Sequence, residues 1–255
     1  MPLQIVTVPC LSDNYAFLLH DAGTGATAVV DVPDPAPIQA ELAARGWTLT
    51  DILITHHHWD HIDGVAPLVA ATGAKTWGNA NDADRLPPLD HAVPPGGTVT
   101  VGGESGTVID VSGHTVGHIA FHFPESHAVF TADSLMALGC GRLFEGSPEM
   151  MFASLARLAA LPPETLVCSG HEYTASNAKF ALTIDPANPA LISRVRAIDT
   201  ARSDNRPTVP STLQEELDTN PFLRAHDPAI RAQLGLETAD DVAVFAEIRA
   251  RKDRF

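Results

Sequence analysis

Four potential metal ligands, His56, His58, Asp60 and His61, lie within six residues in the interior of this chain and form a His-x-His-x-Asp-His motif. They follow the apolar run of residues 52–54, which predicts a strand that ends just before them. A tight loop at a strand end can turn His56 and His58 towards one point, and Asp60 and His61 towards a second point beside it. Imidazole and carboxylate groups are ligands that borderline divalent metals prefer. The motif therefore predicts two adjacent metal sites at a strand end.

Three more ligand types follow predicted strands further along the chain. They are His114 after residues 107–111, Asp133 after residues 128–131, and His171 after residues 166–168. Each has a glycine or another small residue beside it, which lets a loop approach a metal closely. Taken singly, each has an ordinary explanation as a turn or cap residue, so the inference depends on their joint occurrence. With the motif, they predict a two-metal hydrolytic centre, in which the metals are roughly 3.5–4 Å apart.

The first two thirds of the chain contain many short apolar runs, which are separated by Gly, Pro, Asn and Asp. These runs predict strands over residues 3–8, 15–19, 28–31, 52–55, 107–111, 119–123, 128–131 and 166–168, and helices over residues 37–45, 65–72 and 148–160. Strands that alternate with helices, and glycine pairs that suit hairpins, predict an α/β layered domain.

After residue 173 the pattern becomes helical. Helices are expected over residues 188–203, 228–234 and 239–251, and another from Ser211, which would form a capping box with Gln214. We therefore predict two domains, residues 1–172 with the metal centre and residues 173–255 with a helical fold.

The net charge argues against two classes of partner, and the spacing of the cysteines argues against two kinds of cysteine site. The formal net charge is −15, whereas nucleic acids and anionic membranes bind cationic surfaces, so neither is an expected partner. Cys10, Cys140 and Cys168 are too widely spaced for a disulfide framework or a Cys-x-x-Cys metal site. The first residues lack the features of a secretory signal, and no apolar run is long enough to span a bilayer. We expect a cytoplasmic protein.

The metal motif resembles the signature of the metallo-β-lactamase superfamily, and other segments narrow the resemblance to the glyoxalase II family. These segments are Leu11-Ser12-Asp13-Asn14-Tyr15, Gly113-His114-Thr115, Gly139-Cys140-Gly141-Arg142, Gly170-His171-Glu172-Tyr173-Thr174, Asn220-Pro221-Phe222-Leu223-Arg224 and residues 249–255. The resemblance covers nearly the whole chain. It implies an αββα sandwich followed by a small all-helical domain that binds glutathione.

The resemblance also implies a role for each ligand. The first metal would be held by His56, His58 and His114, and the second by Asp60, His61 and His171, with Asp133 bridging the two. Two divalent ions are expected, zinc foremost, with iron or manganese as alternatives. The implied reaction is hydrolysis of S-(2-hydroxyacyl)glutathione, such as the S-D-lactoylglutathione of methylglyoxal detoxification, by a metal-bridged hydroxide. Asp60 and Asp133 are the expected catalytic carboxylates.

Five residues match positions at which the family contacts glutathione: Arg142, Phe144, Tyr173, Arg249 and Lys252. Some family members have Lys and Tyr at the positions of Arg142 and Phe144. The arginine keeps the cation, whereas the phenylalanine lacks the hydroxyl group. Arg249 and Lys252 are three residues apart, on one face of a predicted helix. The alternative for this pair is a solvated helix end.

Three other functions remain open at this point. A mononuclear iron persulfide dioxygenase would keep the fold and use only the first site. A lactonase or β-lactamase would keep both sites, and a non-enzymatic protein would hold its metals structurally. Structural zinc sites are usually closed and rich in cysteine, unlike this set of ligands. We expect a monomer, with a dimer left open.

Overall fold

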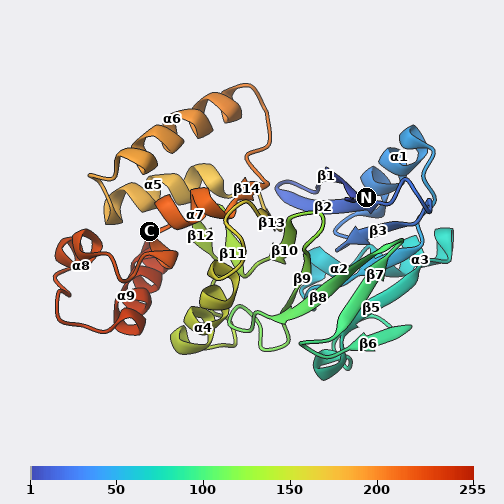
Figure 1. Ribbon diagram of the computed structural model, residues 1–255, viewed down its shortest axis with the longest axis horizontal. Coiled ribbons are helices and arrows are strands. Elements are labelled where there is room, and N and C mark those ends of the chain that lie inside the picture. Colours follow the sequence, from blue (N-terminus) through green and yellow to red (C-terminus); the bar gives the residue numbers. More distant parts are fainter. Residues whose placement is uncertain (1) are drawn as a thin grey trace. The chain divides into compact units, whose positions relative to one another are not determined.

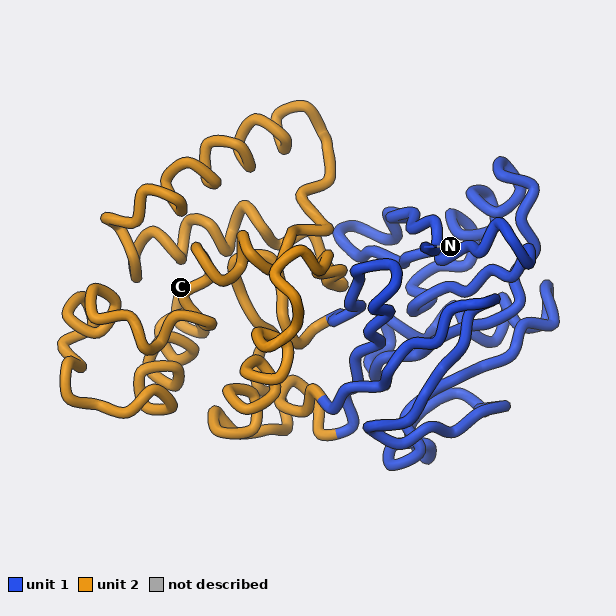
Figure 2. Tube along the Cα trace, in the orientation of Figure 1, with its two compact units in different colours: residues 1–110, 117–132 blue, residues 111–116, 133–255 orange. Residues whose placement is uncertain are grey.

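The computed structural model describes residues 2–255 (Figure 1). The chain forms two compact units, shown in different colours in Figure 2. Among the described residues, unit 1 comprises residues 2–110 and Gly117–Ala132, and unit 2 comprises Val111–Val116 and Asp133–Phe255. This division follows spatial compactness and differs from the division at residue 173 that the change in sequence pattern predicts. The two domains of residues 1–172 and 173–255 stay a prediction.

A mixed six-stranded sheet forms one layer of unit 1. Its strands, in spatial order, are β1 (Gln4–Cys10), β2 (Asn14–His20), β3 (Thr27–Val30), β4 (Asp51–Leu53), β5 (Lys75–Asn79) and β6 (His91–Val93). The pairs β1–β2 and β2–β3 are antiparallel, whereas β3 to β6 run parallel. Every residue of β2 and β3 is buried, as expected for strands that are covered on both faces.

Four antiparallel strands form the second layer of unit 1. They are β7 (Thr98–Val101), β8 (Glu104–Asp110), β9 (Ile119–Phe123) and β10 (Ala128–Ala132). The expected glycine pair joins β7 to β8, and Gly102 takes a φ of +58°, which suits a two-residue hairpin turn. Phe17 of β2 packs edge-on against Phe130 of β10 at 5.6 Å, so the two layers meet face to face.

Helices cover the outer face of the mixed sheet. Unit 1 contains α1 (Pro35–Arg45), α2 (Trp59–Ile62), α3 (Val65–Thr72) and the short 3-10 helix η1 (Ala80–Asp82). Asp34 caps the start of α1 and Gly46, with a φ of +68°, ends it. Ile38 and Leu42 of α1 join Val8 and Ile52 of the sheet in one buried apolar cluster. This packing fixes the strand end that carries the His-x-His-x-Asp-His motif.

Unit 2 is mostly helical. It contains β11 (Leu135–Met136), β12 (Gly139–Cys140), α4 (Pro148–Ala159), β13 (Leu166–Ser169), α5 (Thr174–Ile184), α6 (Pro189–Ser203), β14 (Ser211–Thr212), α7 (Leu213–Thr219), η2 (Pro221–Leu223), α8 (Pro228–Leu234) and α9 (Asp241–Arg254). Within residues 2–255, no helix is both long and apolar enough to cross a membrane.

The predicted helices and longer strands are confirmed within a few residues, with one error at a helix cap. The capping box is formed by Thr212 and Glu215, one residue later than predicted. Ser211 instead pairs with Val167 in the β13–β14 ladder, and its hydroxyl group donates to Glu216. Ser211 is therefore still extended backbone and precedes the helix.

Candidate metal centre

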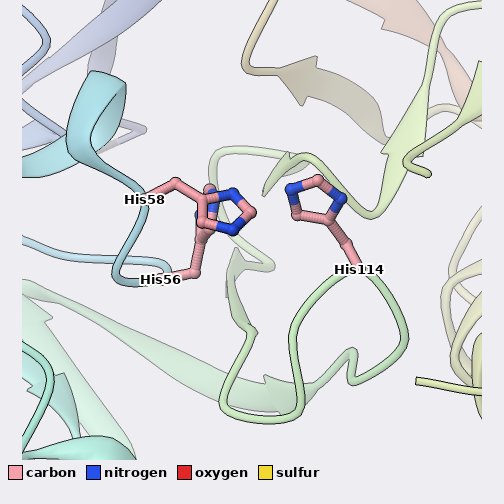
Figure 3. Close-up of side chains that lie close together, drawn as sticks. All are labelled: His56, His58 and His114. Carbon is pink, nitrogen blue, oxygen red and sulfur yellow. The ribbon is translucent and has the colours of Figure 1, made fainter. Parts of the chain in front are cut away.

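Four ligand candidates of unit 1 lie on the loop after β4 and on α2. His56 and His61 are fully buried, whereas His58 and Asp60 are partly exposed. The rings of His56 and His58 meet edge to face at 4.8 Å. Figure 3 labels these two side chains together with His114, which comes from the loop after β8. The four ligand candidates of unit 1 therefore follow the end of strand β4, in the loop that leads into α2 and in α2 itself.

A buried carboxylate, Asp31, orients two of these histidines. Its Oδ2 lies 2.8 Å from Nδ1 of His61 and accepts a hydrogen bond from the hydroxyl group of Thr55 at 2.7 Å. Because the Thr55 proton goes to Asp31, the Thr55 oxygen accepts from Nδ1 of His56, 3.0 Å away. Both imidazoles therefore carry their proton on Nδ1, which leaves Nε2 as the donor atom for a metal.

The backbone at Asp31 is in the left-handed region, with a φ of +56°. The Thr55 amide donates to the other Asp31 oxygen at 2.9 Å, so both carboxylate oxygens are bound. A non-glycine residue in this conformation is held by its surroundings. The ligand-type atoms of Asp31, His56 and His61 lie within 4.8 Å of one another. Asp31 is thus a part of the centre for which the sequence analysis gave no role.

Asn14 positions the carboxylate of Asp60. Its side-chain amide donates to Oδ2 of Asp60 at 3.1 Å and to the Asp60 backbone oxygen at 3.0 Å. The same Oδ2 lies 3.9 Å from Nε2 of His61. Asn14 is buried at the start of β2, so the turn between β1 and β2 supports the motif. This gives a physical role to a segment that the sequence analysis identified by resemblance alone.

Two neighbouring histidines have other contacts. Nδ1 of His57 lies 3.5 Å from Oδ2 of Asp82. The buried ring of His118 stacks on His56 at 4.5 Å. Nδ1 of His118 lies 3.1 Å from the Ile119 carbonyl oxygen. His118 therefore supports the ring of His56 by packing.

Two ligand candidates of unit 2, His114 and His171, converge on the third, Asp133. Nε2 of His114 lies 3.4 Å from Oδ2 of Asp133, and Nε2 of His171 lies 3.3 Å from Oδ1. Nδ1 of His114 donates to the Arg142 backbone oxygen at 2.7 Å, which again leaves Nε2 as the ligand atom. All three side chains are buried. Each oxygen of Asp133 thus faces a different imidazole.

The spacing around Asp133 fits bound cations. Two donor atoms that are each about 2.1 Å from a tetrahedral zinc lie about 3.4 Å apart. The two nitrogen-to-oxygen distances match this separation, and they are longer than a good hydrogen bond. Imidazole nitrogens with a lone pair and a carboxylate are also the donor set that zinc, iron and manganese accept. The residues present therefore fit divalent metals.

Two of the predicted substrate residues meet at a carboxylate of α9. Asp253 Oδ1 lies 2.8 Å from Nη2 of Arg249 and 3.6 Å from Nε of Arg142. The guanidinium of Arg249 also donates to the Cys140 backbone oxygen at 2.9 Å and lies over the Phe222 ring. Arg249 is buried, whereas Arg142 is mostly exposed. The basic C-terminal segment is therefore not a fully solvated helix end.

The other predicted substrate residues lie around aromatic rings. Tyr173 is partly exposed and stacks on the ring of His171 at 4.6 Å. Phe144 is exposed and meets the ring of His114 edge to face at 5.3 Å. The Lys252 ammonium group lies 5.3 Å from the ring centroids of Phe180 and Phe255. Burial, and secondly the charge of Arg249, lower the pKa of Lys252. The predicted metal ligands His171 and His114 thus each have an exposed aromatic ring beside them.

The cysteines of unit 2 are not nucleophiles. Burial raises the pKa of the Cys140 thiol to about 11, and burial also raises the pKa of Cys168. A thiol must ionise to attack a carbonyl carbon, so Cys140 stays inert near neutral pH. Cys140 is buried as the last residue of β12, next to Gly141.

Sequence reasoning missed two carboxylates, Asp31 beside the ligand candidates and Asp253 beside the predicted substrate residues. Asp31 had a signal, because it follows an apolar strand in the same way as Asp133 does. Asp253 also had a signal, since it lies four residues after Arg249, a spacing at which side chains meet on a helix. The contacts of Asp31 with Thr55 and His61 join residues distant in the sequence, and sequence patterns do not reveal such contacts.

Family models match both parts of the chain. The model described as metallo-beta-lactamase superfamily matches residues 12–171, and the one described as hydroxyacylglutathione hydrolase C-terminus matches residues 172–255. A hydroxyacylglutathione hydrolase of Jannaschia sp. (strain CCS1) is 70% identical over 252 residues, which are 99% of this chain and 98% of the relative. One of Ruegeria pomeroyi is 64% identical over the full length of both chains.

Solved structures share the fold. ETHE1 from Myxococcus xanthus has a TM-score of 0.67 at 25% identity, and the match covers 99% of this chain and 98% of the ETHE1 chain. TTHA1623 in a di-iron-bound form has a TM-score of 0.62 at 28% identity, over 86% of this chain and all of its own. The two full-length relatives thus carry one name, while the structural neighbours carry several.

Proposed function

The chain belongs to the hydroxyacylglutathione hydrolases of the metallo-β-lactamase superfamily and hydrolyses hydroxyacylglutathione, and we propose that seven His and Asp side chains hold two divalent cations for this reaction. The fold is the αββα sandwich of the superfamily, followed by the helical region of residues 172–255. The sequence-based expectations of fold, family and thioester hydrolysis are thereby confirmed.

In this proposal each cation has three ligands of its own and shares a fourth. The first would be held by His56, His58 and His114, the second by Asp60, His61 and His171, and Asp133 would be shared by both. The observation that carries the assignment is Asp133, whose two oxygens face the Nε2 atoms of two different histidines. The ions are drawn from zinc, iron and manganese, all of which suit these ligands.

When bound, the cations would supply Lewis acidity, polarising the thioester carbonyl and lowering the pKa of a shared water. Asp60, held by Asn14, accepts a hydrogen bond from the attacking water and so directs its lone pair towards the carbonyl carbon. The leaving group is the glutathione thiol, which departs as an anion because the pKa of a thiol is only about 8.5. No separate general acid is required.

Glutathione is recognised by cations and aromatic rings of unit 2. Arg142, Arg249 and Lys252 bind its carboxylates, since they form a local cationic group on a chain with a net charge of −15. Tyr173 and Phe144, each packed on a ligand histidine, contact the peptide backbone of the substrate. The acyl group includes D-lactoyl, and the products are a 2-hydroxy acid and glutathione.

The remaining features of the proposal concern organisation. Residues 1–172 form the catalytic domain and residues 173–255 the glutathione-binding domain, and the protein is a monomer. We place it in the cytoplasm, where its three buried thiols remain reduced. Nucleic acids and membranes are not partners, because the chain is strongly acidic.

The test is hydrolysis of S-D-lactoylglutathione by protein loaded with zinc, iron or manganese, with the metal content of each sample measured. Loss of activity in a chelator, and its return when metal is added, are expected. S-D-lactoyl-N-acetylcysteamine, which keeps the thioester and lacks the rest of glutathione, is the matched control and should react with a much higher KM. Two metals per chain and a strong preference for the glutathione thioester support the proposal. One metal per chain with full activity, or equal rates on a β-lactam or lactone, would contradict it.

A further inference from the structure

The turn between β11 and β12 connects a predicted metal ligand to a predicted substrate ligand. The backbone oxygen of Cys140, in β12, accepts from Arg249 at 2.9 Å. The backbone oxygen of Arg142, two residues later, accepts from Nδ1 of His114 at 2.7 Å. Gly141 lies between these two residues, and a Cβ added to it would be 1.9 Å from the backbone oxygen of Asp133. The backbones at Gly141 and Asp133 are therefore in direct contact. The position of this short segment therefore sets His114 and Arg249 together.

Three buried polar side chains of the helical region hold this turn. Asn177 of α5 donates to the Ala137 oxygen at 3.0 Å, and the Leu138 amide donates to Glu216 of α7 at 2.8 Å. Asn220 donates to the Met136 and Gly139 oxygens at 3.1 and 3.0 Å. We refer to Asn177, Glu216 and Asn220 as the turn triad. Leu138 has a φ of +56°, a conformation that needs such support.

Glu216 is the central member of the turn triad. It is fully buried, and four donors surround its carboxylate. These donors are the Leu138 amide, the Ser211 hydroxyl group, the Asn220 amide group and the Arg194 guanidinium. A carboxylate can accept all four bonds, and the charge of Arg194 compensates its own. A neutral amide of the same shape would present two hydrogens of its own among these donors.

We propose that Glu216 is a positioning residue of the centre, which acts with Asn177 and Asn220 to fix the Met136–Arg142 backbone against both His114 and Arg249. The inference rests on the proposed function, and it deepens that function by coupling metal binding to substrate binding through one turn. No member of the turn triad touches the reacting atoms. Its effect passes through the Arg142 and Cys140 carbonyl oxygens.

Glu216→Gln should weaken both properties at once. The amide group of the new side chain opposes at least one of the four donors, so the turn shifts to relieve the clash. Loss of an outer partner of a metal-bound histidine costs about 10- to 100-fold in metal affinity. We expect zinc affinity to fall about tenfold and the KM for S-D-lactoylglutathione to rise several-fold. An altered visible spectrum of the cobalt-substituted protein should accompany these changes.

The matched control is Glu215→Gln on the same helix. Glu215 is the neighbouring acid, exposed in the capping box, where glutamine is also accommodated. This variant removes the same charge and should keep the zinc affinity, cobalt spectrum and KM of the parent. Asn177→Ala is a milder second variant, which removes one hydrogen bond to the turn and should change the same three quantities by a smaller factor. It carries the test if Glu216→Gln does not fold.

The readouts separate positioning from stability. Zinc affinity is measured by competition with a chelator, and the melting temperature is recorded beside it. A lower melting temperature with unchanged zinc affinity, cobalt spectrum and KM in both variants would overturn the inference and leave Glu216 a purely structural residue. If the parent protein failed to hydrolyse the thioester, the proposed function would fail, while the zinc affinity and the cobalt spectrum would still test the turn triad.

Discussion

The two groups of ligand candidates are oriented by different kinds of chemistry. In unit 1 a buried side chain, the Asp31 carboxylate, fixes His61 directly and His56 through Thr55. In unit 2 a backbone carbonyl, that of Arg142, fixes His114. The charged partner raises the basicity of the imidazoles it holds, whereas the carbonyl gives a weaker polarisation with a fixed geometry. The comparison teaches that the orientation of His56 and His61 depends on a side chain that mutation can remove, whereas the orientation of His114 depends on the course of the main chain.

The largest expected effect comes from the residue that links the ligands of unit 2. Asp133→Asn should lower kcat/KM by at least about 1000-fold, beyond the 10- to 100-fold loss typical of outer partners. The amide keeps the shape and loses the negative charge that faces two Nε2 atoms. Metal analysis should show fewer than two ions per chain. Glu125→Ala, at an exposed acidic position, is the control, and near-parental activity of Asp133→Asn would refute the bridging assignment.

A smaller effect tests the orienting groups against each other. Asp31→Asn keeps a residue type that tolerates the positive φ and removes the charge, so zinc affinity should fall about 10- to 100-fold. Arg142→Met leaves the backbone carbonyl in place and should leave zinc affinity unchanged. Chelator competition measures both. Equal losses in the two variants would erase the distinction between the side-chain and main-chain orienting groups.

The next effect compares a buried and an exposed cation. Arg249→Met should raise the KM for S-D-lactoylglutathione about tenfold or more, because a buried charged hydrogen bond to substrate is lost. Arg142→Met should raise KM at most about fivefold, since exposed ion pairs contribute little. Steady-state kinetics at low and high salt provide the measurement. A larger KM effect at Arg142 than at Arg249 would reverse the assigned order.

The smallest effect concerns Cys140, whose backbone oxygen accepts a hydrogen bond from Arg249 at 2.9 Å and whose thiol makes only a long contact with the same group, at 3.8 Å. Cys140→Ser should keep activity within about twofold between pH 6 and 8, where a thiol with a pKa of about 11 stays protonated. In the unfolded chain the thiol ionises from its ordinary value of 9.0, so its stabilising contribution is complete below pH 9 and is lost as pH rises to about 11. The melting temperature should therefore fall further between pH 7 and pH 10 in the parent protein than in Cys140→Ser.

Much of the fold was predictable because the strands and helices have clear periodicity and clear ends. The helix α6, for example, begins after Asn188 with Pro189 at its first position, as its sequence predicts. The edge elements β6, β11 and β12 were not predicted, because two or three residues carry no periodic signal. The helix α5 was also missed, since its exposed polar stripe is narrow, consisting of Ser176, Lys179 and Thr183, and more than half of Thr174–Ile184 is buried.

The ligand types were predictable because they follow strand ends, whereas their support was not. Asn14 and Asp60 are 46 residues apart, and Glu216 and Leu138 are 78 residues apart. Such partners are set by tertiary packing, and one sequence gives no sign of them. Local patterns thus identify the groups that could hold a metal, and long-range contacts decide which ring nitrogen faces it.

Gly141 has a consequence for how related chains are sorted. An alanine there would place its methyl carbon against the Asp133 carbonyl oxygen and within 3.0 Å of the His114 ring nitrogen. A chain with all seven proposed ligands intact and any larger residue at this position would therefore have its backbone displaced at Asp133. Inspection of the ligand motif alone would classify that chain as active, so the residue at position 141 should be read before a homologue is counted as a working hydrolase.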